Sequence, residues 1–322
     1  MNLILTTKCS KGCPYCFASD FRGKNSKTPD MDLEKVKHYI DLAIKENNNF
    51  KLLGGEPTDY PYFKEVLEYI QENKVREFLL VTNLLFKEDI RNLLKEFTIK
   101  NRNVISFLLN STDLEFSDRM KRFEENIDAI SASKNNITLG ITLDASKTVE
   151  YYKDYLKKYI YPLRNKVSSR FRLSIAFPGE GEDKDYHRVV NNKEYGNMFY
   201  EVYKDLNENG YNISVDCVTF PCMFTDQQRD YIKRVSEKKD MRNLHICKNP
   251  AIDVFADGSV SYCYPTKWIK EEMGQSVYEV NTKVDMQYYK FEKKAKKPKE
   301  CLTCNFYLDK VCKGPCLAFE VK

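Results

Sequence analysis

Three cysteines close to the amino terminus, Cys9, Cys13 and Cys16, have the spacing that points most directly to chemistry. They follow the short apolar run Leu3–Leu5 in the order Cys-x3-Cys-x2-Cys. Three thiolates on one loop can hold three corners of a cubane [4Fe-4S] cluster, whereas such clusters usually take four cysteines. The fourth iron then keeps an open coordination position, which is what a reactive metal site requires.

Two non-catalytic interpretations explain the same cysteines. A disulfide requires an oxidising compartment, but the chain carries no signal-peptide pattern and no apolar run of membrane-spanning length. A structural zinc site normally takes four ligands, and the three histidines, His38, His187 and His245, are distant in sequence. The open cluster is therefore the favoured interpretation, and we expect a cytoplasmic protein.

Composition narrows the class of protein further. The chain has 322 residues, with 52 basic and 47 acidic side chains, so its net charge of +5 does not argue for nucleic-acid binding. The basic run Phe291–Lys299 is typical of a solvated helix end, with a docking patch for an acidic peptide as the alternative. Eleven cysteines without a secretion signal indicate metal binding rather than disulfides.

A second motif, Gly54-Gly55-Glu56-Pro57, follows the second predicted strand. Glycines allow the backbone to approach a ligand closely, and Glu56 adds a carboxylate. An ordinary strand-to-helix turn explains this motif when it is taken alone. Because the carboxyl ends of parallel barrel strands meet at one rim, we expect the motif to lie beside the cysteine loop.

The elements that position these residues alternate between strands and helices over the first two-thirds of the chain. The predicted strands are Asn2–Thr6, Phe50–Leu53, Glu77–Val81, Val104–Leu109, Ile137–Leu143 and Phe171–Phe177. The predicted helices are Asp32–Lys45, Tyr62–Glu72, Glu88–Phe97, Phe116–Ser133, Thr148–Tyr161 and Lys193–Glu208. Six strand–helix repeats imply an α/β protein with a parallel sheet, a pattern that open doubly wound sheets and barrels share.

Past about residue 210 we expect this alternation to stop, because cysteines become frequent. Ile252–Phe255 and Val260–Cys263 flank Ala256-Asp257-Gly258, which predicts a tight hairpin with Gly258 in the left-handed conformation. Glu292–Glu300 is predicted to be helical. We place a domain boundary near residue 230, which separates a barrel over residues 1–230 from a smaller domain over residues 231–322.

The cysteine spacing, with the aromatic Phe17 after the last cysteine, resembles the radical S-adenosylmethionine (SAM) enzymes. The resemblance implies a partial six-stranded (β/α) TIM-type barrel, with a [4Fe-4S] cluster on Cys9, Cys13 and Cys16 and SAM as the second cofactor. It also implies that Gly54, Gly55 and Glu56 contact the amino group of the SAM methionine.

Polar residues at the ends of later strands suit the ribose and carboxylate of SAM in such a barrel. These candidates are Thr82, Asn83, Asn110, Ser111, Arg172 and Ser174. Helix capping explains each of them about equally well. The sequence departs from the family at Leu84, where Thr-Asn-Gly is frequent. The catalytic acid–base candidates, Asp144, Asp216 and Cys217, rest on position alone.

The later cysteines resemble the SPASM extension of radical SAM enzymes. Cys247, Gly258 and Cys263 have its Cys-x(9–15)-Gly-x4-Cys spacing. The following cysteines are Cys301, Cys304, Cys312 and Cys316. Here seven residues rather than five separate Cys304 from Cys312, and the last cysteine of the family pattern is absent.

Eight cysteines remain after the first three, which is enough for two four-thiolate clusters, so the resemblance implies one or two auxiliary clusters. One assignment gives the nearer cluster Cys222, Cys247, Cys263 and Cys316. The farther cluster then has Cys301, Cys304 and Cys312, with Cys217 as the candidate for its fourth ligand. A zinc site at the carboxyl-terminal cysteines, and Cys217 as a free thiol, are the alternatives.

The resemblance implies reductive cleavage of SAM to a 5′-deoxyadenosyl radical, followed by oxidative modification of a peptide, such as a thioether or C–C crosslink in the maturation of a ribosomal peptide. Sulfatase-type Cys or Ser oxidation, dehydrogenation of a small alcohol, and a non-catalytic iron–sulfur electron carrier are the alternatives. Gly54–Pro57 argues against the carrier, which needs no SAM pocket.

The implied partners are a peptide or protein substrate and an electron donor such as flavodoxin or ferredoxin. Because the first predicted strand begins at Asn2, we expect a leader peptide to be recognised by a separate protein or by the catalytic domain itself.

Overall fold

The computed structural model describes residues 1–13, 15–16, 28–116, 118–176, 193–215, 219–236 and 251–319. Its strands are β1 (Asn2–Ile4), β2 (Phe50–Leu53), β3 (Phe78–Thr82), β4 (Ile105–Asn110), β5 (Ile137–Leu143), β6 (Arg170–Ile175), β7 (Asn212–Val215), β8 (Asp253–Val254), β9 (Ser259–Ser261) and β10 (Glu271–Glu272). Its α-helices are α1 (Leu33–Lys45), α2 (Phe63–Glu72), α3 (Glu88–Lys100), α4 (Arg119–Ala129), α5 (Val149–Tyr155), α7 (Lys193–Glu208), α8 (Asp226–Val235), α10 (Val277–Lys294), α11 (Lys299–Leu302) and α12 (Asn305–Leu308).

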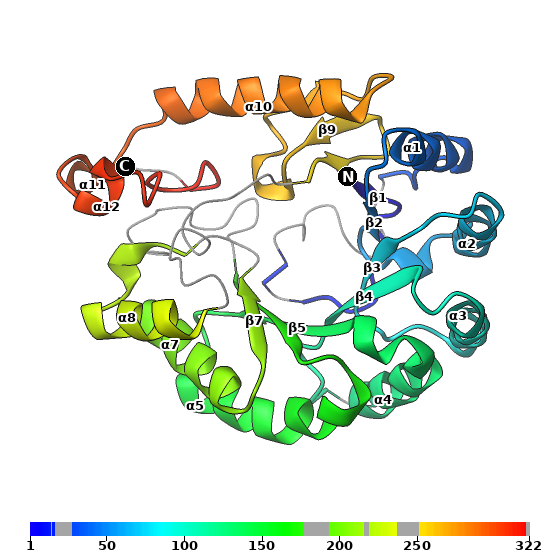
Figure 1. Cartoon of the computed structure of the whole chain (residues 1–322), viewed down its shortest axis with the longest axis horizontal. Helices are drawn as coiled ribbons and strands as arrows, with labels where there is room; N and C mark the ends of the chain where they lie inside the picture. The colour runs from blue at the N-terminus through cyan, green and yellow to red at the C-terminus, as the bar shows by residue number, and fades with distance from the viewer. Residues whose placement is uncertain are drawn as a thin grey trace.

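All of these strands belong to one sheet, in the order β10-β9-β8-β1-β2-β3-β4-β5-β6-β7. The strands from β1 to β7 pair in parallel, each with the next along the chain. Figure 1 shows the sheet curved into an incomplete ring, with the helices from α1 to α8 outside it. This arrangement confirms the predicted α/β partial barrel. Each pair of parallel strands needs a crossover connection, and the crossover helices cover the outer face of the sheet.

Strand side chains alternate between the helix-covered face and the barrel interior. In β3, Phe78 and Leu80 are buried beneath the helices, whereas Leu79 and Val81 are half-buried on the inner face. The same period of two runs along β4 from Ile105 to Asn110. The inner face therefore carries side chains that remain accessible to a bound molecule.

Helix capping explains why the first predicted helix begins where it does. The Asp32 Oδ1 accepts hydrogen bonds from the backbone N–H groups of Glu34 and Lys35, at 3.0 and 3.3 Å. Helix α1 then buries Val36 and Ile40 against the sheet. The predicted bounds of β2, β5 and α7 are reproduced without change.

The prediction that strand–helix alternation stops near residue 210 is wrong, because β7 adds a seventh parallel strand beside β6. This strand has only four residues, and its Asn212 and Ser214 are exposed, so its apolar periodicity is weak. The predicted helix Thr148–Tyr161 is also α-helical only as far as Tyr155. A π-helical segment, Leu156–Ile160, and a 3₁₀ segment, Tyr161–Lys166, follow it.

Two other predicted helices are shorter than expected. The helix predicted over Phe116–Ser133 is α-helical only over Arg119–Ala129. The helix predicted over Glu292–Glu300 is interrupted, because α10 ends at Lys294 and α11 begins after Pro298. Proline disfavours helical dihedrals in the residue before it, which accounts for the interruption.

The carboxyl-terminal part continues the barrel sheet. Strands β8 and β9 form the predicted antiparallel hairpin, with Gly258 at φ +89°. Strand β8 then pairs in parallel with β1, and the Asn2 Nδ2 donates to the Asp253 Oδ1 at 2.7 Å. A strand close to residue 253 therefore forms the neighbour of the first strand of the chain.

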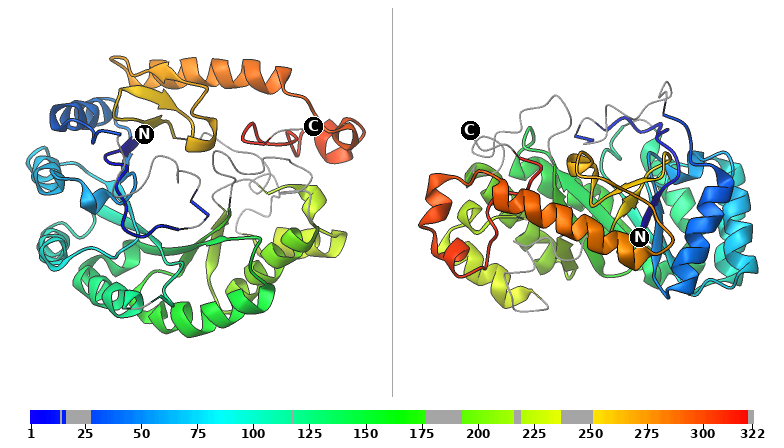
Figure 2. Two further views of the ribbon diagram at one scale, coloured as in Figure 1. Left: turned by 180° about the vertical axis from the view of Figure 1, so that it is seen from behind. Right: turned by 90° about the horizontal axis from the view of Figure 1, so that it is seen from above.

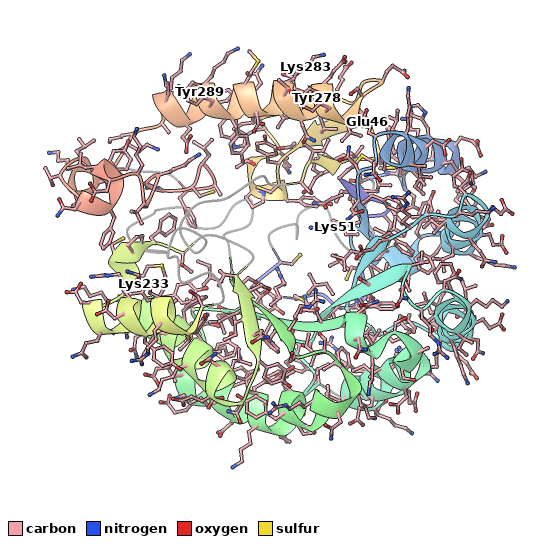
Figure 3. All side chains as sticks on the ribbon, in the orientation of Figure 1. Glu46, Lys51, Lys233, Tyr278, Lys283 and Tyr289 are labelled. Carbon is pink, nitrogen blue, oxygen red and sulfur yellow. The ribbon has the colours of Figure 1, made fainter. Side chains whose placement is uncertain are left out.

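Helix α10 crosses the side of the ring between α1 and α11 (Figure 2). The Glu46 carboxylate, just after α1, accepts hydrogen bonds from the backbone N–H groups of Val277 and Tyr278, at 2.9 and 3.1 Å. Figure 3 shows Glu46 at this end of α10. An anionic side chain at a helix amino terminus is favourable, so this contact fastens α10 to the barrel.

Within the ranges described above, no helix combines the length and the apolar character needed to cross a membrane.

Candidate functional site

The cysteine loop rests on the turn after β2. The backbone N–H of Gly55 donates to the Thr6 carbonyl, and the N–H of Glu56 donates to the Lys8 carbonyl, both at 2.7 Å. A Cβ on Gly55 would lie 2.0 Å from the Lys8 carbonyl oxygen, and one on Gly54 would lie 2.3 Å from that of Thr6. The two glycines therefore allow the loop that carries Cys9 to cross directly over the end of β2.

Glu56 is buried and accepts hydrogen bonds at both carboxylate oxygens. Its Oε1 accepts from the Thr58 hydroxyl at 2.8 Å and the Thr82 hydroxyl at 2.7 Å, and its Oε2 accepts from the Asn83 backbone N–H at 2.8 Å. Burial raises the pKa of Glu56, while the hydrogen bonds from Asn83, Thr82 and Thr58 oppose that rise. The carboxylate thus joins the carboxyl ends of β2 and β3.

The turn after β3 brings Asn83 to the first cysteine, since its Nδ2 donates to the Cys9 Sγ at 3.8 Å. The next residue, Leu84, is fully buried and has a left-handed φ of +55°. A non-glycine residue pays about 1–2 kcal/mol for that conformation. Leu84 thus keeps a backbone conformation suited to glycine, and its side chain is buried in the core.

Asn126 of α4 supports this turn from below. Its Nδ2 donates to the carbonyls of Leu84 and Phe86, at 2.8 and 3.2 Å, and its Oδ1 accepts from the Arg91 Nε at 2.6 Å.

Asn126→Ala is expected to reduce the free energy of unfolding by about 2 kcal/mol, because the buried carbonyls of Leu84 and Phe86 lose their hydrogen-bond donor.

Urea unfolding measures this difference. Asn73→Ala is the matched control, since the exposed Asn73 also donates to a carbonyl, that of Tyr69, but from the surface. We expect the control to change stability by less than about 0.5 kcal/mol. Equal effects of the two substitutions would contradict the supporting role of Asn126.

Lys11 lies inside the cysteine loop and is only 4% exposed. Its Nζ donates to the Asn110 carbonyl at 3.0 Å, and the Arg119 Nη2 donates to the Lys11 carbonyl at 3.1 Å. Burial lowers the pKa of Lys11, whereas the charges of Cys13 and Asp113 act in the opposite direction. A buried ammonium needs a nearby anion, and metal-bound thiolates provide that charge. The sequence alone did not single out Lys11, and its position between two cysteines was the available signal.

Tyr15 fastens the other side of the loop to the end of β4. Its hydroxyl hydrogen-bonds to the Thr112 hydroxyl and donates to the Asp113 Oδ2 at 3.1 Å. The Thr112 hydroxyl in turn donates to the Asn110 Oδ1 at 2.5 Å. The side chain of Asn110 therefore supports the cysteine loop through Thr112.

The structure does not bring every sequence-predicted residue to this loop. The Ser111 hydroxyl donates to the Gly140 carbonyl at 3.0 Å, and the Ser174 hydroxyl lies 3.1 Å from that of Thr142. The Asp144 Oδ1 accepts from the Ser146 backbone N–H at 2.9 Å, which is a turn-capping contact. The predicted site residues Asp216, Cys217 and Cys247 lie outside the described residues.

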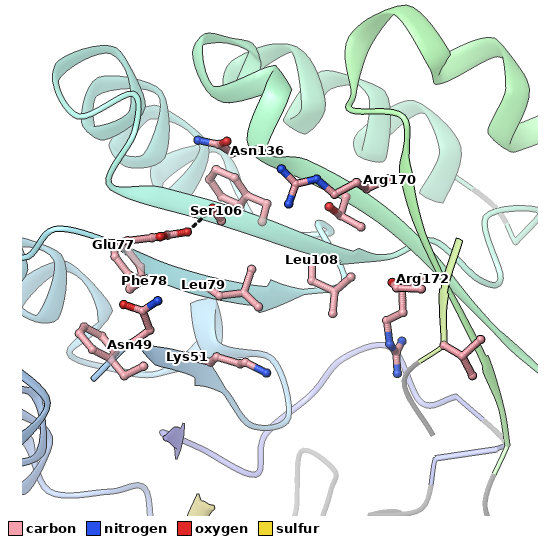
Figure 4. Close-up of a pocket in the computed structure, with 15 residues that line it drawn as sticks. Asn49, Lys51, Glu77, Phe78, Leu79, Ser106, Leu108, Asn136, Arg170 and Arg172 are labelled. Atoms are coloured by element: carbon pink, nitrogen blue, oxygen red, sulfur yellow. Dashed lines mark hydrogen bonds between the residues drawn. The ribbon is translucent and has the colours of Figure 1, made fainter. Parts of the chain in front are cut away.

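A cavity of about 550 Å³ opens on the inner face of the sheet, toward the amino ends of the strands (Figure 4). Lys51 and Arg172 extend into it, and Figure 3 shows Lys51 pointing into the middle of the ring. Arg170 also lines the cavity, as does Glu77, which accepts from the Ser106 hydroxyl at 3.3 Å. Three cations against one carboxylate suit an anionic ligand. Arg172 is one of the residues expected from the sequence to contact SAM, whereas Lys51 and Arg170 were not expected at any site.

The donor groups of the cysteine loop fit an iron–sulfur cluster. Cys9, Cys13 and Cys16 lie in one loop without a disulfide bond to any other described residue, and the charges of Cys13 and Cys9 act on the buried Lys11. Among the described residues, no three His, Cys, Asp or Glu side chains converge closely enough to hold a single metal ion. A cubane differs from one ion because each of its irons takes its own thiolate, so the thiols need not converge on a point.

Residues 3–159 match the model of the Radical SAM superfamily. The match covers 157 of the 322 residues, just under half of the chain. Enzymes of this superfamily use a [4Fe-4S] cluster and SAM, so the cofactors expected from the cysteine spacing are those of the matching family. The match includes the cysteine loop, Glu56, Asn83 and the ends of the strands up to β5.

Two curated relatives match in sequence over part of the chain. A probable GTP 3′,8-cyclase from Methanocaldococcus jannaschii is 24% identical over 144 residues, which cover 44% of this chain and 46% of that protein. The radical SAM cyclopropyl synthase TigE from Paramaledivibacter caminithermalis is 23% identical over 177 residues, covering 48% of this chain and 37% of that protein. The chain spans less than half the length of either relative.

Solved structures resemble the whole fold. Streptococcus suis SuiB bound to S-adenosylmethionine has a TM-score of 0.65 at 14% identity, covering 100% of this chain and 75% of that one. SuiB bound to the precursor peptide SuiA has a TM-score of 0.64 at 15% identity, covering 98% and 71%. Native anSMEcpe with bound AdoMet and Cp18Cys peptide has a TM-score of 0.61 at 18% identity, covering 98% and 88%. At these identities the likeness shows the fold.

Proposed function

We propose that this protein is a radical SAM enzyme that oxidatively modifies a peptide, with Cys9, Cys13 and Cys16 as the cluster ligands. The observation that carries the proposal is the three-cysteine loop, which contains the buried Lys11 and is docked on Gly55 and Glu56. A buried ammonium is unfavourable unless a negative charge lies beside it, and cysteines that hold an anionic cluster provide that charge.

The cluster, when bound together with SAM, supplies the electron transfer that cleaves SAM and so starts radical chemistry on the substrate. The side chains around the cysteine loop hold the cluster ligands in position. Glu56 holds the ends of β2 and β3 together, and the turn it fixes keeps Asn83 beside Cys9. Lys11 offsets negative charge at the thiols, and Tyr15 holds the loop against β4. Each of these groups maintains the position of the cysteines.

A peptide is the favoured substrate because two of the fold neighbours were solved with peptides, SuiB with SuiA and anSMEcpe with Cp18Cys. In this proposal residues 1–230 form the catalytic barrel, and residues 231–322 form a SPASM-like auxiliary part. The substrate or a leader segment is recognised by this chain or by a separate protein, and flavodoxin or ferredoxin delivers the electron.

A second candidate substrate is an anionic nucleotide. Curated relatives are named probable GTP 3′,8-cyclases, and the cavity carries Lys51, Arg170 and Arg172. Cationic side chains of this kind bind phosphate groups well. Sulfatase-type oxidation and alcohol dehydrogenation are further candidates that the same enzyme assay covers.

The test is anaerobic reconstitution with iron and sulfide, followed by reduction and measurement of 5′-deoxyadenosine. We expect SAM cleavage, and we expect a peptide encoded near the gene to lose hydrogen mass in the same reaction. Consumption of GTP instead, reduced by Lys51→Ala, would assign the nucleotide substrate. An iron-loaded protein that neither binds nor cleaves SAM would overturn the enzyme and leave the electron carrier.

A further inference from the structure

We propose that the cavity beside Lys51, Arg170 and Arg172 is a carboxylate subsite, which binds an acidic side chain of the peptide about four residues from the residue that is modified. The choice of a peptide as the ligand rests on the proposed function, whereas the preference for a carboxylate does not. Arg172 is thereby assigned to the substrate rather than to SAM, for which the sequence alone had suggested it.

The carboxylate subsite lies at the end of the barrel opposite to the cysteine loop. The loop rests on Gly55, just beyond the carboxyl end of β2, whereas Lys51 lies near the amino end of the same strand. Gly55 follows Lys51 by four positions, so at about 3.3 Å per residue the two are about 13 Å apart along the strand. A molecule bound in the cavity therefore reaches the loop only if it extends along the inner face of the sheet.

The three cations come from two separate strands of the barrel. Lys51 belongs to β2, whereas Arg170 and Arg172 are two positions apart in β6 and so share one face of that strand. Figure 4 shows Lys51 and Arg172 extending into the cavity. Among the ion pairs formed by the described residues, none includes Lys51 or Arg170. No carboxylate of the described part of the chain therefore neutralises these two charges.

Gly140 of β5 makes room for the side chain of Arg172. The two residues are neighbours in the register of β5 and β6, and a Cβ on Gly140 would lie 3.1 Å from the Arg172 Cβ and 3.4 Å from its Cδ. Gly140 is buried, whereas Thr138 and Thr142, on the same face of β5, are half-buried. The stem of Arg172 therefore packs against Gly140, and this contact restricts the directions in which the guanidinium can extend.

The rest of the cavity suits a peptide better than a polyphosphate. Figure 4 shows Leu79 and Leu108 in the middle of the lining, with Glu77 on the side away from Arg172. Glu77 precedes β3, and β3 lies three strands from β6, which at about 4.8 Å per strand is about 14 Å along the sheet. Glu77 repels the several charges of a polyphosphate, whereas a peptide can place a carboxylate at the arginines and an N–H group at Glu77.

The chemistry of the cations sets what is bound and where. A guanidinium binds a carboxylate through two parallel hydrogen bonds, and an ammonium adds a point charge. An extended peptide advances about 3.3 Å per residue, so about four residues span the distance of about 13 Å from the cavity to the cysteine loop. We therefore expect an Asp or Glu about three to five positions from the modified residue of the substrate.

A pair of short capped alanine peptides, one with a central glutamate and one with a central glutamine, tests the preference for a carboxylate. Saturation-transfer NMR measures their binding to the full-length protein after iron reconstitution. We expect the glutamate peptide to bind about tenfold more tightly, because only its carboxylate forms charge-assisted hydrogen bonds with the arginines. Lys51→Gln and Arg172→Gln are each expected to remove most of this difference and to leave the glutamine peptide unaffected.

Arg102→Gln is the matched control for these two variants. Arg102 is exposed, precedes β4 at the same end of the barrel and does not line the cavity. We expect it to leave the binding of both peptides within about twofold of the wild type, since solvent and salt screen an exposed charge. Equal effects of Arg102→Gln and Arg172→Gln would overturn the carboxylate subsite, as would equal binding of the two peptides to the wild type.

Competition on the wild-type protein is a second measurement, which does not depend on the folding of a variant. We expect SAM to leave the glutamate peptide bound, because SAM belongs at the cysteine loop. Displacement of the peptide by SAM would assign Arg172 to the SAM carboxylate and overturn the subsite. Displacement by GTP at a concentration about tenfold below that of the peptide would assign the cavity to a nucleotide and overturn it as well.

The position of the carboxylate is tested on a peptide that the enzyme modifies. Exchange of its Asp or Glu for the corresponding amide is expected to raise KM about tenfold, with kcat within about twofold, because the contact positions the substrate without touching the reacting atoms. A modified peptide with no acidic residue in the expected interval would contradict the carboxylate subsite.

These outcomes are distinguishable from those of the proposed function. A protein that prefers the glutamate peptide but cleaves no SAM would retain the carboxylate subsite and lose the proposed function. A protein that cleaves SAM but binds both peptides equally would retain the function and lose the subsite.

Discussion

Cys13→Ser is expected to lower the rate of SAM cleavage by a factor on the order of 10³, which corresponds to about 4 kcal/mol. The proposed cluster has three protein ligands, so this substitution leaves it with only two thiolates. Burial raises the pKa of the Cys13 thiol, and the charge of Lys11 acts against that rise. Production of 5′-deoxyadenosine and the iron content together measure the effect.

Ser10→Ala is the matched control for Cys13→Ser, because Ser10 is an exposed residue on the same loop. We expect it to keep both iron and SAM cleavage within about twofold of the wild type. If the Cys13→Ser protein retained its iron and its cleavage rate, Cys13 would not be a ligand and the proposed site would be wrong.

Gly55→Ala is expected to destabilise the protein by about 3 kcal/mol and to lower its iron content. The added Cβ would lie 2.0 Å from the Lys8 carbonyl oxygen and 2.5 Å from its carbon, and these are backbone atoms that no side-chain rotation can clear. The cysteine loop therefore has to move away from β2, and the hydrogen bonds to Thr6 and Lys8 are lost with it.

Gly12→Ala separates this steric effect from the general cost of replacing a glycine in the cysteine loop. Gly12 has φ +61° with open space around its Cβ position, so we expect a cost of about 1 kcal/mol from the backbone alone. Urea unfolding of both metal-free variants provides the comparison. A Gly55→Ala protein as stable as the Gly12→Ala protein would show that the loop does not rest on β2 as described.

Regular periodicity explains why most of the barrel was predictable. The apolar alternation of Ile137–Leu143 and the helical spacing of Lys193–Glu208 were sufficient to place both elements at their observed bounds. Strand β7 and helix α10 were missed because their signals are weak or distributed. Asn212 and Ser214 interrupt the first, and exposed aromatic residues such as Tyr278 and Tyr289 obscure the apolar face of the second.

The candidate site was predictable in its residue types but only partly in its contacts. The cysteine spacing and Gly54–Pro57 together indicated a radical SAM enzyme, and residues 3–159, which contain both, match the Radical SAM superfamily model. The partner of the glycines was not predictable, because it is the Thr6–Lys8 backbone, almost fifty residues away in sequence. Lys11 was missed for the same reason, since its burial depends on β4 and α4.

By itself the sequence determined the alternation of strands and helices, the three-cysteine spacing and the order of the motifs, because periodicity and spacing are local properties of a chain. Only the tertiary structure decided that the parallel sheet curves into an incomplete ring, that β8 pairs with β1, and that Glu56 joins two strand ends. Each of these depends on contacts between distant segments, and such contacts form when the hydrophobic core brings those segments together.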